Sequence, residues 1–517
     1  MTRRRAEPRC LAFALAVSAA LAQAQQGGAA ASSGVTLVPR LGVTQTWTDN
    51  LHLNDQNKDA ALITTVSPGF SLTSNSGSLR GTLDYSLNGI AYVKSEQPSR
   101  IQNALAANLQ AELVNDTFFV DMRATIGQQN ASAFGVQSAP SLGSQGAAAS
   151  LANDNQRETG TLTVSPLLRG MVGGVATYEL RGDFTRTEVR GSGVGDSHGS
   201  GGSLLVSEWN AGILGWWFQA SSQRIKSSSA STSANYNDVV KVGLNYRPDV
   251  DWYFSVNAGS ERNNYQGGGN NDGGTAGLTA QWTPTPRTRI NGNWQHHNYG
   301  NTHGLTFEHR LERSVWSYSD NQSVMLANNG FSGGVLTLTN YDQFFLLFSS
   351  IEPDPIKRDA LVRSYLQGQG LSPDAPANGS FLTSGPSRLR NQMLSVTLQG
   401  VRSSLSAQVN RSLTTRLGNN QYGGTDLANT SRIEQRSYSL TASHQLTPLS
   451  GLAVTAARQE TTGDLRTQSV QLTSLLVNWN VRLGLRLNGQ LGARRSHFEG
   501  ALPYTENAVY GSLIQQF

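Results

Sequence analysis

Arginine side chains near the end of the chain are the residues best placed to do chemistry. Between residues 387 and 517 the sequence holds 13 arginines against six acidic residues. Arg482, Arg486 and Arg494 are separated by even numbers of positions, so a single strand places them on one polar face. A guanidinium binds carboxylates bidentately, so this pattern predicts an anion-selective stripe. The candidate pore-lining residues are Arg416, Arg482, Arg486 and Arg494.

The alternative is that these arginines form ion pairs with acids such as Asp84 or Glu112, or contact lipopolysaccharide. The overall charge does not favour either interpretation. The formal charge is +5, but residues 1–24 contribute four arginines and one glutamate. The remaining 36 basic and 34 acidic residues leave +2, so no nucleic-acid-binding surface is indicated.

Histidine and serine offer weaker candidates. Four of the eight histidines are His296, His297, His303 and His309. A metal needs converging ligands, and adjacent residues such as His296 and His297 point to opposite faces of a strand. The same holds for the neighbours Ser443 and His444. The sequence predicts no nucleophile elbow, no zinc-protease motif and no phosphate loop, so we expect no enzyme, no metal and no cofactor.

Eight tryptophans flank candidate turns or strand ends. Such a distribution is typical of the aromatic girdle of a membrane barrel, and sugar stacking is the alternative. The residues are Trp209, Trp216, Trp217, Trp252, Trp282, Trp294, Trp316 and Trp479.

The elements that must position these side chains are strands with two unlike faces. From Leu79 to Val93 every second residue is apolar or glycine, while Arg80, Asp84 and Asn88 are among the residues between them. A strand points successive side chains to opposite faces, so this segment has one apolar and one polar face. Similar segments recur from about Val35 to Phe517.

Short connections alternate with long ones rich in Gly, Ser and Asn, such as 129–156 and 263–275. Beyond residue 24 no apolar run is long enough for a spanning helix. The predicted fold is therefore all-β, a transmembrane antiparallel up-and-down β-barrel of roughly 18 to 22 strands. The barrel is expected over residues 35–517. The segment 204–225 is left open as one long strand or a hairpin.

The two ends of the chain point to export. Residues 1–24 have an arginine-rich start, an apolar stretch and the small-residue sequence Ala-Gln-Ala, which predict a cleaved signal peptide. Residues 25–34 are interpreted as a short linker. The one cysteine, Cys10, lies inside the signal peptide. Phe517 is the expected insertion signal, although Gln515 stands where a second aromatic often precedes it.

One segment, 321–390, breaks the alternation and is predicted to be a long, partly helical insertion. Pro355 to Gln367 is the expected helix, with Asp354 as its N-cap and Gly368 beyond its end. The insertion is either a plug or constriction within the lumen, or a surface loop that carries a helix.

Several short motifs resemble one family along nearly the whole mature chain. They are Trp47-Thr48-Asp49-Asn50, Thr65-Val66-Ser67-Pro68-Gly69, Trp282-Thr283-Pro284-Thr285-Pro286-Arg287-Thr288, His309-Arg310, Arg313-Ser314-Val315-Trp316, Ser443-His444-Gln445-Leu446-Thr447-Pro448-Leu449 and Tyr504-Thr505-Glu506-Asn507-Ala508. In this order they resemble the β-barrel porin-like outer-membrane proteins associated with PEP-CTERM/exosortase systems. The resemblance implies a Gram-negative outer-membrane barrel encoded alongside exopolysaccharide production and protein sorting. It brings no catalytic residues.

Three functions follow as hypotheses. The first is an outer-membrane channel associated with export of an exopolysaccharide, expected to be anionic. The second is a non-conducting structural or glycan-anchoring barrel, and the third a hydrolase at the rim. The expected partners are outer-membrane lipid and lipopolysaccharide, the insertion machinery, and the exopolysaccharide with its export machinery.

Overall fold

The structure is a computed structural model built almost entirely of long strands. It describes residues 34–93, 95–139, 151–191, 195–209, 212–228, 234–265, 269–326, 362, 381–383, 385–418, 424–465 and 467–517. The strands are β1 (Val35–Thr48), β2 (Ala61–Asn75), β3 (Leu79–Val93), β4 (Arg100–Val114), β5 (Phe118–Asn130), β6 (Gln156–Val172), β7 (Ala176–Val189), β8 (Ser197–Glu208), β9 (Leu214–Ser227), β10 (Asn235–Tyr246), β11 (Trp252–Asn263), β12 (Asn271–Thr285), β13 (Thr288–His297), β14 (Gly300–Arg310), β15 (Ser314–Met325), β16 (Ser387–Gln399), β17 (Ser403–Arg416), β18 (Arg432–Thr447), β19 (Ser450–Thr462), β20 (Ser469–Arg482), β21 (Leu487–Glu499) and β22 (Tyr504–Gln516). The short 3-10 helix η2 covers Asp426–Ala428.

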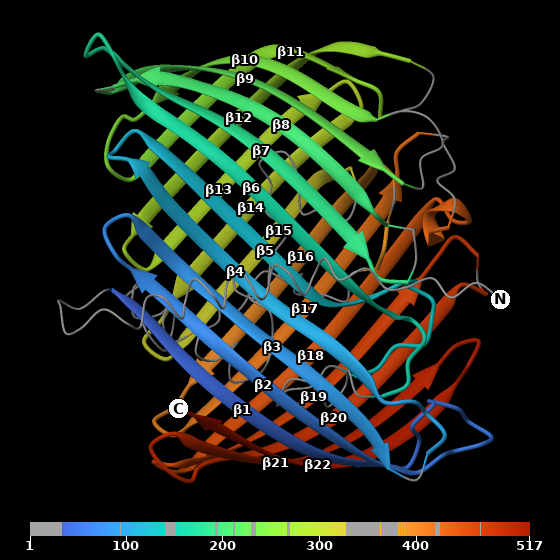
Figure 1. Ribbon diagram of the computed structural model, residues 1–517. Coiled ribbons are helices and arrows are strands. Elements are labelled where there is room, and N and C mark those ends of the chain that lie inside the picture. Colours follow the sequence, from blue (N-terminus) through green and yellow to red (C-terminus); the bar gives the residue numbers. More distant parts are fainter. Residues whose placement is uncertain are drawn as a thin grey trace.

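These strands form one closed barrel (Figure 1). Each strand pairs antiparallel with the next, and β1 pairs with β22, for example Thr44 with Ser512. Closure leaves no strand edge unpaired, which is a requirement for crossing a bilayer. The sheet has 22 strands, an even number at the upper end of the predicted range. Among the described residues no helix is long and apolar enough to cross a membrane.

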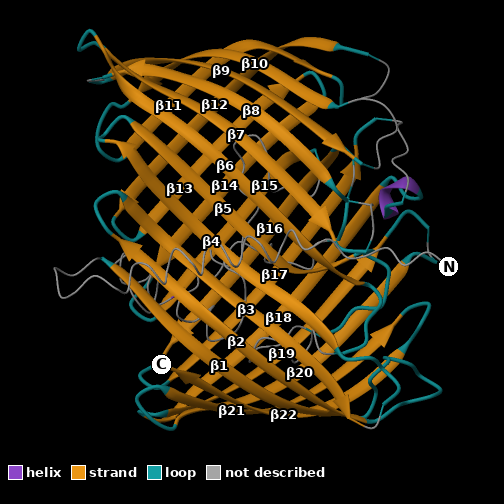
Figure 2. Ribbon diagram, viewed as in Figure 1, coloured by secondary structure: helices purple, strands orange, loops and turns teal. Residues whose placement is uncertain are grey.

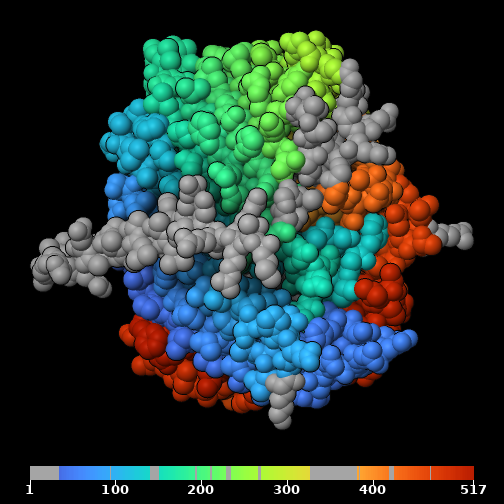
Figure 3. Space-filling model, turned by 45° about the vertical axis from the view of Figure 1, so that its right-hand side comes forward, coloured from blue at the N-terminus to red at the C-terminus, as the bar shows by residue number. Residues whose placement is uncertain are grey.

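The outer face of the barrel is apolar, as the alternation predicts. On β1 the exposed residues include Leu41, Val43 and Trp47, while Thr44 and Thr46 between them are buried. Most of the tryptophans named above also have exposed side chains on the wall or at its ends: Trp209, Trp216, Trp282, Trp294, Trp316 and Trp479. Figure 3 shows part of this outer wall, with strands from the first half of the chain in blue to green. Such an apolar surface faces lipid.

The two ends of the barrel differ in their connections (Figure 2). At the short-turn end, on the left, short turns join β2 to β3, β4 to β5, and each later even-numbered strand to the odd-numbered strand that follows it. At the long-loop end, on the right, lie the connection from β5 to β6 and η2. Val35 and Phe517 belong to the short-turn end, where the amide of Phe517 donates to the carbonyl of Pro39 at 2.9 Å.

The structure decides one segment that the alternation left open and corrects two others. The segment 204–225 is split between β8 and β9, so the hairpin alternative is correct. The single strand predicted from Arg482 to Arg494 is wrong, because a turn at 483–486 separates β20 from β21. Leu483 and Leu485 continue the alternation through that turn, which hides it. The predicted insertion 321–390 is too long at both ends, because 321–325 belong to β15 and 387–390 to β16.

The helix predicted from Pro355 to Gln367 lies outside the described residues except for Val362. Pro68 and Pro166 lie inside β2 and β6. The register continues past each proline without a shift, but the pairing of β2 with β3 and of β6 with β7 is interrupted there. Proline has no amide hydrogen to donate, which accounts for the gap.

Candidate functional site

The inward face of the barrel is lined mainly by small hydroxyl side chains. Cross-strand pairs such as Thr161–Thr187 at 3.1 Å and Ser317–Ser395 at 2.7 Å join neighbouring strands on this face. Many inward hydroxyls are buried, and Thr46 is only 2% exposed. The polar face predicted from the alternation is therefore the lumen wall.

Several inward charges on this wall form ion pairs. Both terminal nitrogens of Arg40 contact Asp84 at 2.5 Å. Arg181 lies 3.2 Å from both Asp121 and Asp183. These contacts match the alternative in which lumen arginines pair with acids, Asp84 among them.

The four candidate arginines do not form one stripe. Arg494 is buried in β21 and contacts Glu506 at 2.6 Å, with both side chains 1% exposed. Arg482 is the last residue of β20 and pairs with Asn488 of β21. Asn488 lies six residues before Arg494 on β21, which is about 20 Å at 3.3–3.4 Å per residue. Arg486 lies in the turn between β20 and β21. Arg416 lies at the long-loop end of β17 and donates to the carbonyl of Leu427 at 3.0 Å.

Two segments from opposite sides of the barrel meet at the long-loop end. Asn130, the last residue of β5, forms an isolated bridge with Phe381, which precedes β16. The amide of Leu382 donates to the carbonyl of Asn130 at 3.0 Å. In a ring of 22 strands, β16 is the eleventh strand after β5, so the two lie opposite each other. The chain therefore crosses the lumen at this end.

A second contact, which we call the mouth clamp, joins Ser132 and Ala133 to Asp426 of η2. The Ser132 hydroxyl donates to one carboxylate oxygen of Asp426 at 2.9 Å, and the Ala133 amide donates to the other at 2.6 Å. Burial raises the pKa of Asp426, and these two hydrogen bonds oppose the rise in part. Ala133 also packs with Phe381, Leu427 and Ile433.

The loops beside the clamp are folded inward over the wall. Leu51 and Leu151 pack on inward residues at the strand ends, including Phe498 and Tyr504. The amide of Ala152 donates to the carbonyl of Leu51 at 3.2 Å, and the Tyr504 hydroxyl donates to the carbonyl of Gln137. The described loops therefore form an apolar constriction on one side of the mouth.

The other side of the mouth holds a buried carboxylate and a histidine. Glu261 is 1% exposed; it lies 2.6 Å from Nδ1 of His297 and accepts the amide of Asn298. Tyr299 stacks on His297 with ring centroids 4.7 Å apart. Burial raises the pKa of Tyr265, which packs with Ile225, Leu326 and Leu417 in the same region.

The four histidines His296, His297, His303 and His309, which the sequence predicts not to converge, each have a different partner. His297 faces the lumen, whereas His296 contacts Asn301 at 2.9 Å, and His303 lies 3.2 Å from Asp320. His309 pairs with Thr288 at 2.9 Å. Among the described residues no group of three His, Cys, Asp or Glu side chains could hold a metal ion.

Ser443 and His444 also have separate partners, Ser404 and Ser403. One Gly-x-Ser-x-Gly spacing, Gly195 to Gly199, was missed at the sequence level. Ser197 is the first residue of β8 and is buried, whereas the adjacent His198 is exposed. A nucleophile elbow needs a strand-to-helix turn, and here a strand follows the loop.

Fold and site together define the class: a closed, up-and-down transmembrane β-barrel of the outer-membrane type, with a hydroxyl-lined lumen constricted at one end. No family model and no curated protein matches the chain. Similar solved structures include the siderophore receptor PirA from Acinetobacter baumannii, at 8% identity and a TM-score of 0.45, covering 93% of this chain and 81% of that one. The ferric-catecholate import receptor Fiu from K12 E. coli shares 8% identity at a TM-score of 0.46, covering 92% and 81%. OccK2 (OpdF) from Pseudomonas aeruginosa shares 9% sequence identity at a TM-score of 0.35, and the match covers 93% of this chain and 98% of that one. At these distances the likenesses carry no argument about function, and the class rests on closure and on the two faces of the wall.

Proposed function

We propose that this protein is an outer-membrane channel whose loop-constricted lumen serves exopolysaccharide export in a PEP-CTERM/exosortase context. The observation that most directly supports a constricted channel is the contact of Asn130 with Phe381 across a closed barrel. A constriction on a polar lumen limits passage without removing the polar path. The polymer and its context rest on the resemblance described for the sequence.

Lumen chemistry supports a hydrated polymer as cargo. Rows of hydroxyls such as Thr163–Thr185 and Thr441–Thr455 offer neutral hydrogen-bonding groups, which suit sugar hydroxyls. Since Arg40 and Arg494 are paired with acids, the wall does not present them as unpaired cations. We assign selection of an anionic polymer to Arg482 and Arg486 at the short-turn end.

The test is conductance after removal of the crossing segment. Met325 pairs with Ser387, so a short Gly-Ser linker can replace residues 327–385 and close the β15–β16 hairpin. In planar bilayers we expect larger steady currents from this variant than from the full barrel, and a current drop when an anionic polysaccharide is added. Arg482→Gln with Arg486→Gln in that variant should weaken the block by the polysaccharide.

The second candidate is a non-conducting, glycan-anchoring barrel. The buried Arg494–Glu506 pair and the buried inward hydroxyls favour it, because they show a lumen wall with little water contact. A folded linker variant that carries no current would reject the channel, and polysaccharide binding without current would support the anchor.

A further inference from the structure

The outer wall at the long-loop end carries a basic surface on strands β17 to β21. Register places the outward residues of these strands in three successive rows. Of these three rows, the one nearest the loops is Arg411, Arg436, Glu460, Gln471 and Glu499, with Glu434 and Arg432 beyond it. The second is Val409, Tyr438, Arg458, Thr473 and His497, and the third is Ala407, Leu440, Ala456, Leu475 and Arg495. The wall thus changes from charged to apolar over three rows.

Over the whole of this surface five arginines, Arg411, Arg432, Arg436, Arg458 and Arg495, outnumber three glutamates, Glu434, Glu460 and Glu499. Glu434 is contacted by three guanidiniums, those of Arg411 at 2.8 Å, Arg432 at 2.6 Å and Arg436 at 2.7 Å. One carboxylate cannot neutralise three cations. The surface therefore attracts a further anion.

Arg495 indicates how far along the barrel wall, between the loops and the apolar belt, that anion would bind. It is exposed and lies opposite Leu475, in the row that is otherwise apolar. It makes no ion pair or hydrogen bond with any residue that the structure describes. A guanidinium at the border of lipid extends toward the polar layer and binds phosphate through paired hydrogen bonds.

An apolar groove lies directly below these cations. It has a volume of about 470 Å³ and is lined by Val409, Tyr438, Leu440 and Leu475, with Arg458 and Arg495 among its lining residues. Tyr438, Leu440 and Leu475 are 41%, 48% and 48% exposed. The groove and its cations together match a molecule with an acyl chain and a phosphate.

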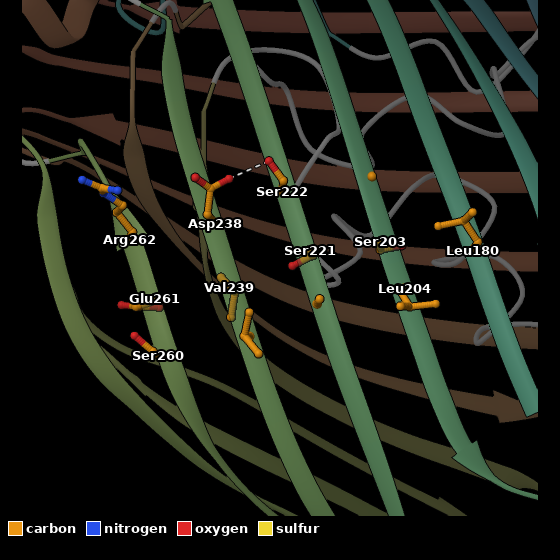
Figure 4. Close-up of a pocket in the computed structure, with 13 residues that line it drawn as sticks. Leu180, Ser203, Leu204, Ser221, Ser222, Asp238, Val239, Ser260, Glu261 and Arg262 are labelled. Carbon is orange, nitrogen blue, oxygen red and sulfur yellow. Dashed lines mark hydrogen bonds between the residues drawn. The ribbon is translucent and has the colours of Figure 1, made fainter. Parts of the chain in front are cut away.

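A groove on the far part of the barrel lacks this combination (Figure 4). It is lined by residues of β7 to β11, and there Asp238 accepts the hydroxyl of Ser222. Its arginine, Arg262, is paired with Asp272 at 3.2 Å, as Arg458 is with Glu460 at 2.6 Å. Among the described residues, its lining holds no second arginine that corresponds to Arg495. This groove therefore provides a matched control.

We propose that the basic surface binds a phosphorylated, acylated glycolipid of the outer leaflet. Short turns of outer-membrane barrels lie in the periplasm and long loops outside, so this end of the wall meets the outer leaflet. Arg495 would hold a headgroup phosphate together with Arg458, which also contacts Glu460 at 2.6 Å, and an acyl chain would lie on Leu440 and Leu475. This binding does not depend on whether the barrel conducts.

The test is native mass spectrometry of the detergent-solubilised barrel with purified lipid A. Arg458→Gln with Arg495→Gln should weaken binding about tenfold or more, the scale for loss of charged hydrogen bonds. Arg262→Gln of the control groove with Arg224→Gln, whose side chain lies 3.7 Å from the groove residue Asp238, should leave it unchanged. Both variants must keep the heat-dependent gel shift of a folded barrel.

Two further arms identify the ligand chemistry. Dephosphorylated lipid A should bind the wild-type barrel about as weakly as lipid A binds the double variant. Inorganic phosphate at millimolar concentration should not displace lipid A, because it lacks the acyl chain. Equal binding of the phosphorylated and dephosphorylated lipids, or equal binding by wild type and the Arg458/Arg495 variant, would overturn the proposal.

Discussion

Asp426 is the residue at which the mouth contact becomes sensitive to pH. Because burial raises its pKa, the folded protein binds this proton more tightly than the unfolded chain does. The carboxyl therefore contributes most to the folded mouth at low pH, and the contribution falls as pH rises through the raised pKa. Acidification should therefore favour the closed clamp by removing the buried charge, even though the hydrogen bonds from Ser132 and Ala133 are themselves stronger to the ionised carboxylate.

We expect the open fraction of the channel to fall as pH is lowered from 7 toward about 4, the range above the ordinary pKa of a carboxyl. Asp426→Asn imitates the protonated side chain, so its open fraction should be low and independent of pH. Single-channel recording at several pH values checks this. An unchanged pH profile in Asp426→Asn would assign the effect to another group.

Arg494 and Glu506 form the most deeply buried ion pair of the described lumen wall. Removal of one partner leaves an unpaired buried charge, which costs about 3–5 kcal/mol, whereas removal of both leaves a neutral site. Glu506→Leu alone should therefore destabilise the barrel by this amount. Arg494→Leu with Glu506→Leu should restore most of the loss, as measured by urea unfolding in detergent. Equal loss in the single and double variants would show that the pair acts through packing alone.

At the scale of elements, alternation predicted strands well but not their register or every turn. The segment from Leu79 to Val93 is β3 as expected, because its faces meet lipid and lumen. The turn at 483–486 was hidden because its leucines keep the period of two. Register was also out of reach, so the partners of Arg494 and Arg416 could not be predicted from the residues that surround them in sequence.

Close strand contact should make some glycines irreplaceable. A Cβ on Gly259 of β11 would lie 2.0 Å from the carbonyl oxygen of Val240, whereas one on Gly127 of β5 would meet nothing within 4 Å. Gly259→Ala should cost about 1–3 kcal/mol through forced movement of β10, and Gly127→Ala should cost far less. Urea midpoints of the two variants give the comparison. Similar midpoints for both would contradict the close packing of β10 on β11.

At the scale of the whole molecule, the closed barrel was predictable because lipid imposes it. Two unlike strand faces and alternating connections together leave a closed barrel as the structure that satisfies the backbone. The crossing of the lumen was not predictable. Asn130 and Phe381 are far apart in sequence, and neither belongs to a repeating pattern that specifies its partner.

The central claim is that the mouth clamp restricts passage through the lumen, and a reversible disulfide tests it most directly. The chain has one cysteine, Cys10, in the predicted signal peptide, so Ser132→Cys with Asp426→Cys introduces an isolated pair at the clamp. Ser317→Cys with Ser395→Cys, within the wall, is the control.

The measurement is the conductance of the residue 132/426 double-cysteine barrel in a planar bilayer, before and after addition of a reductant. We predict low conductance when oxidised and a several-fold rise on reduction, with no change in the wall control. Equal conductance in the oxidised and reduced states, with the disulfide verified by mass spectrometry, would contradict the claim.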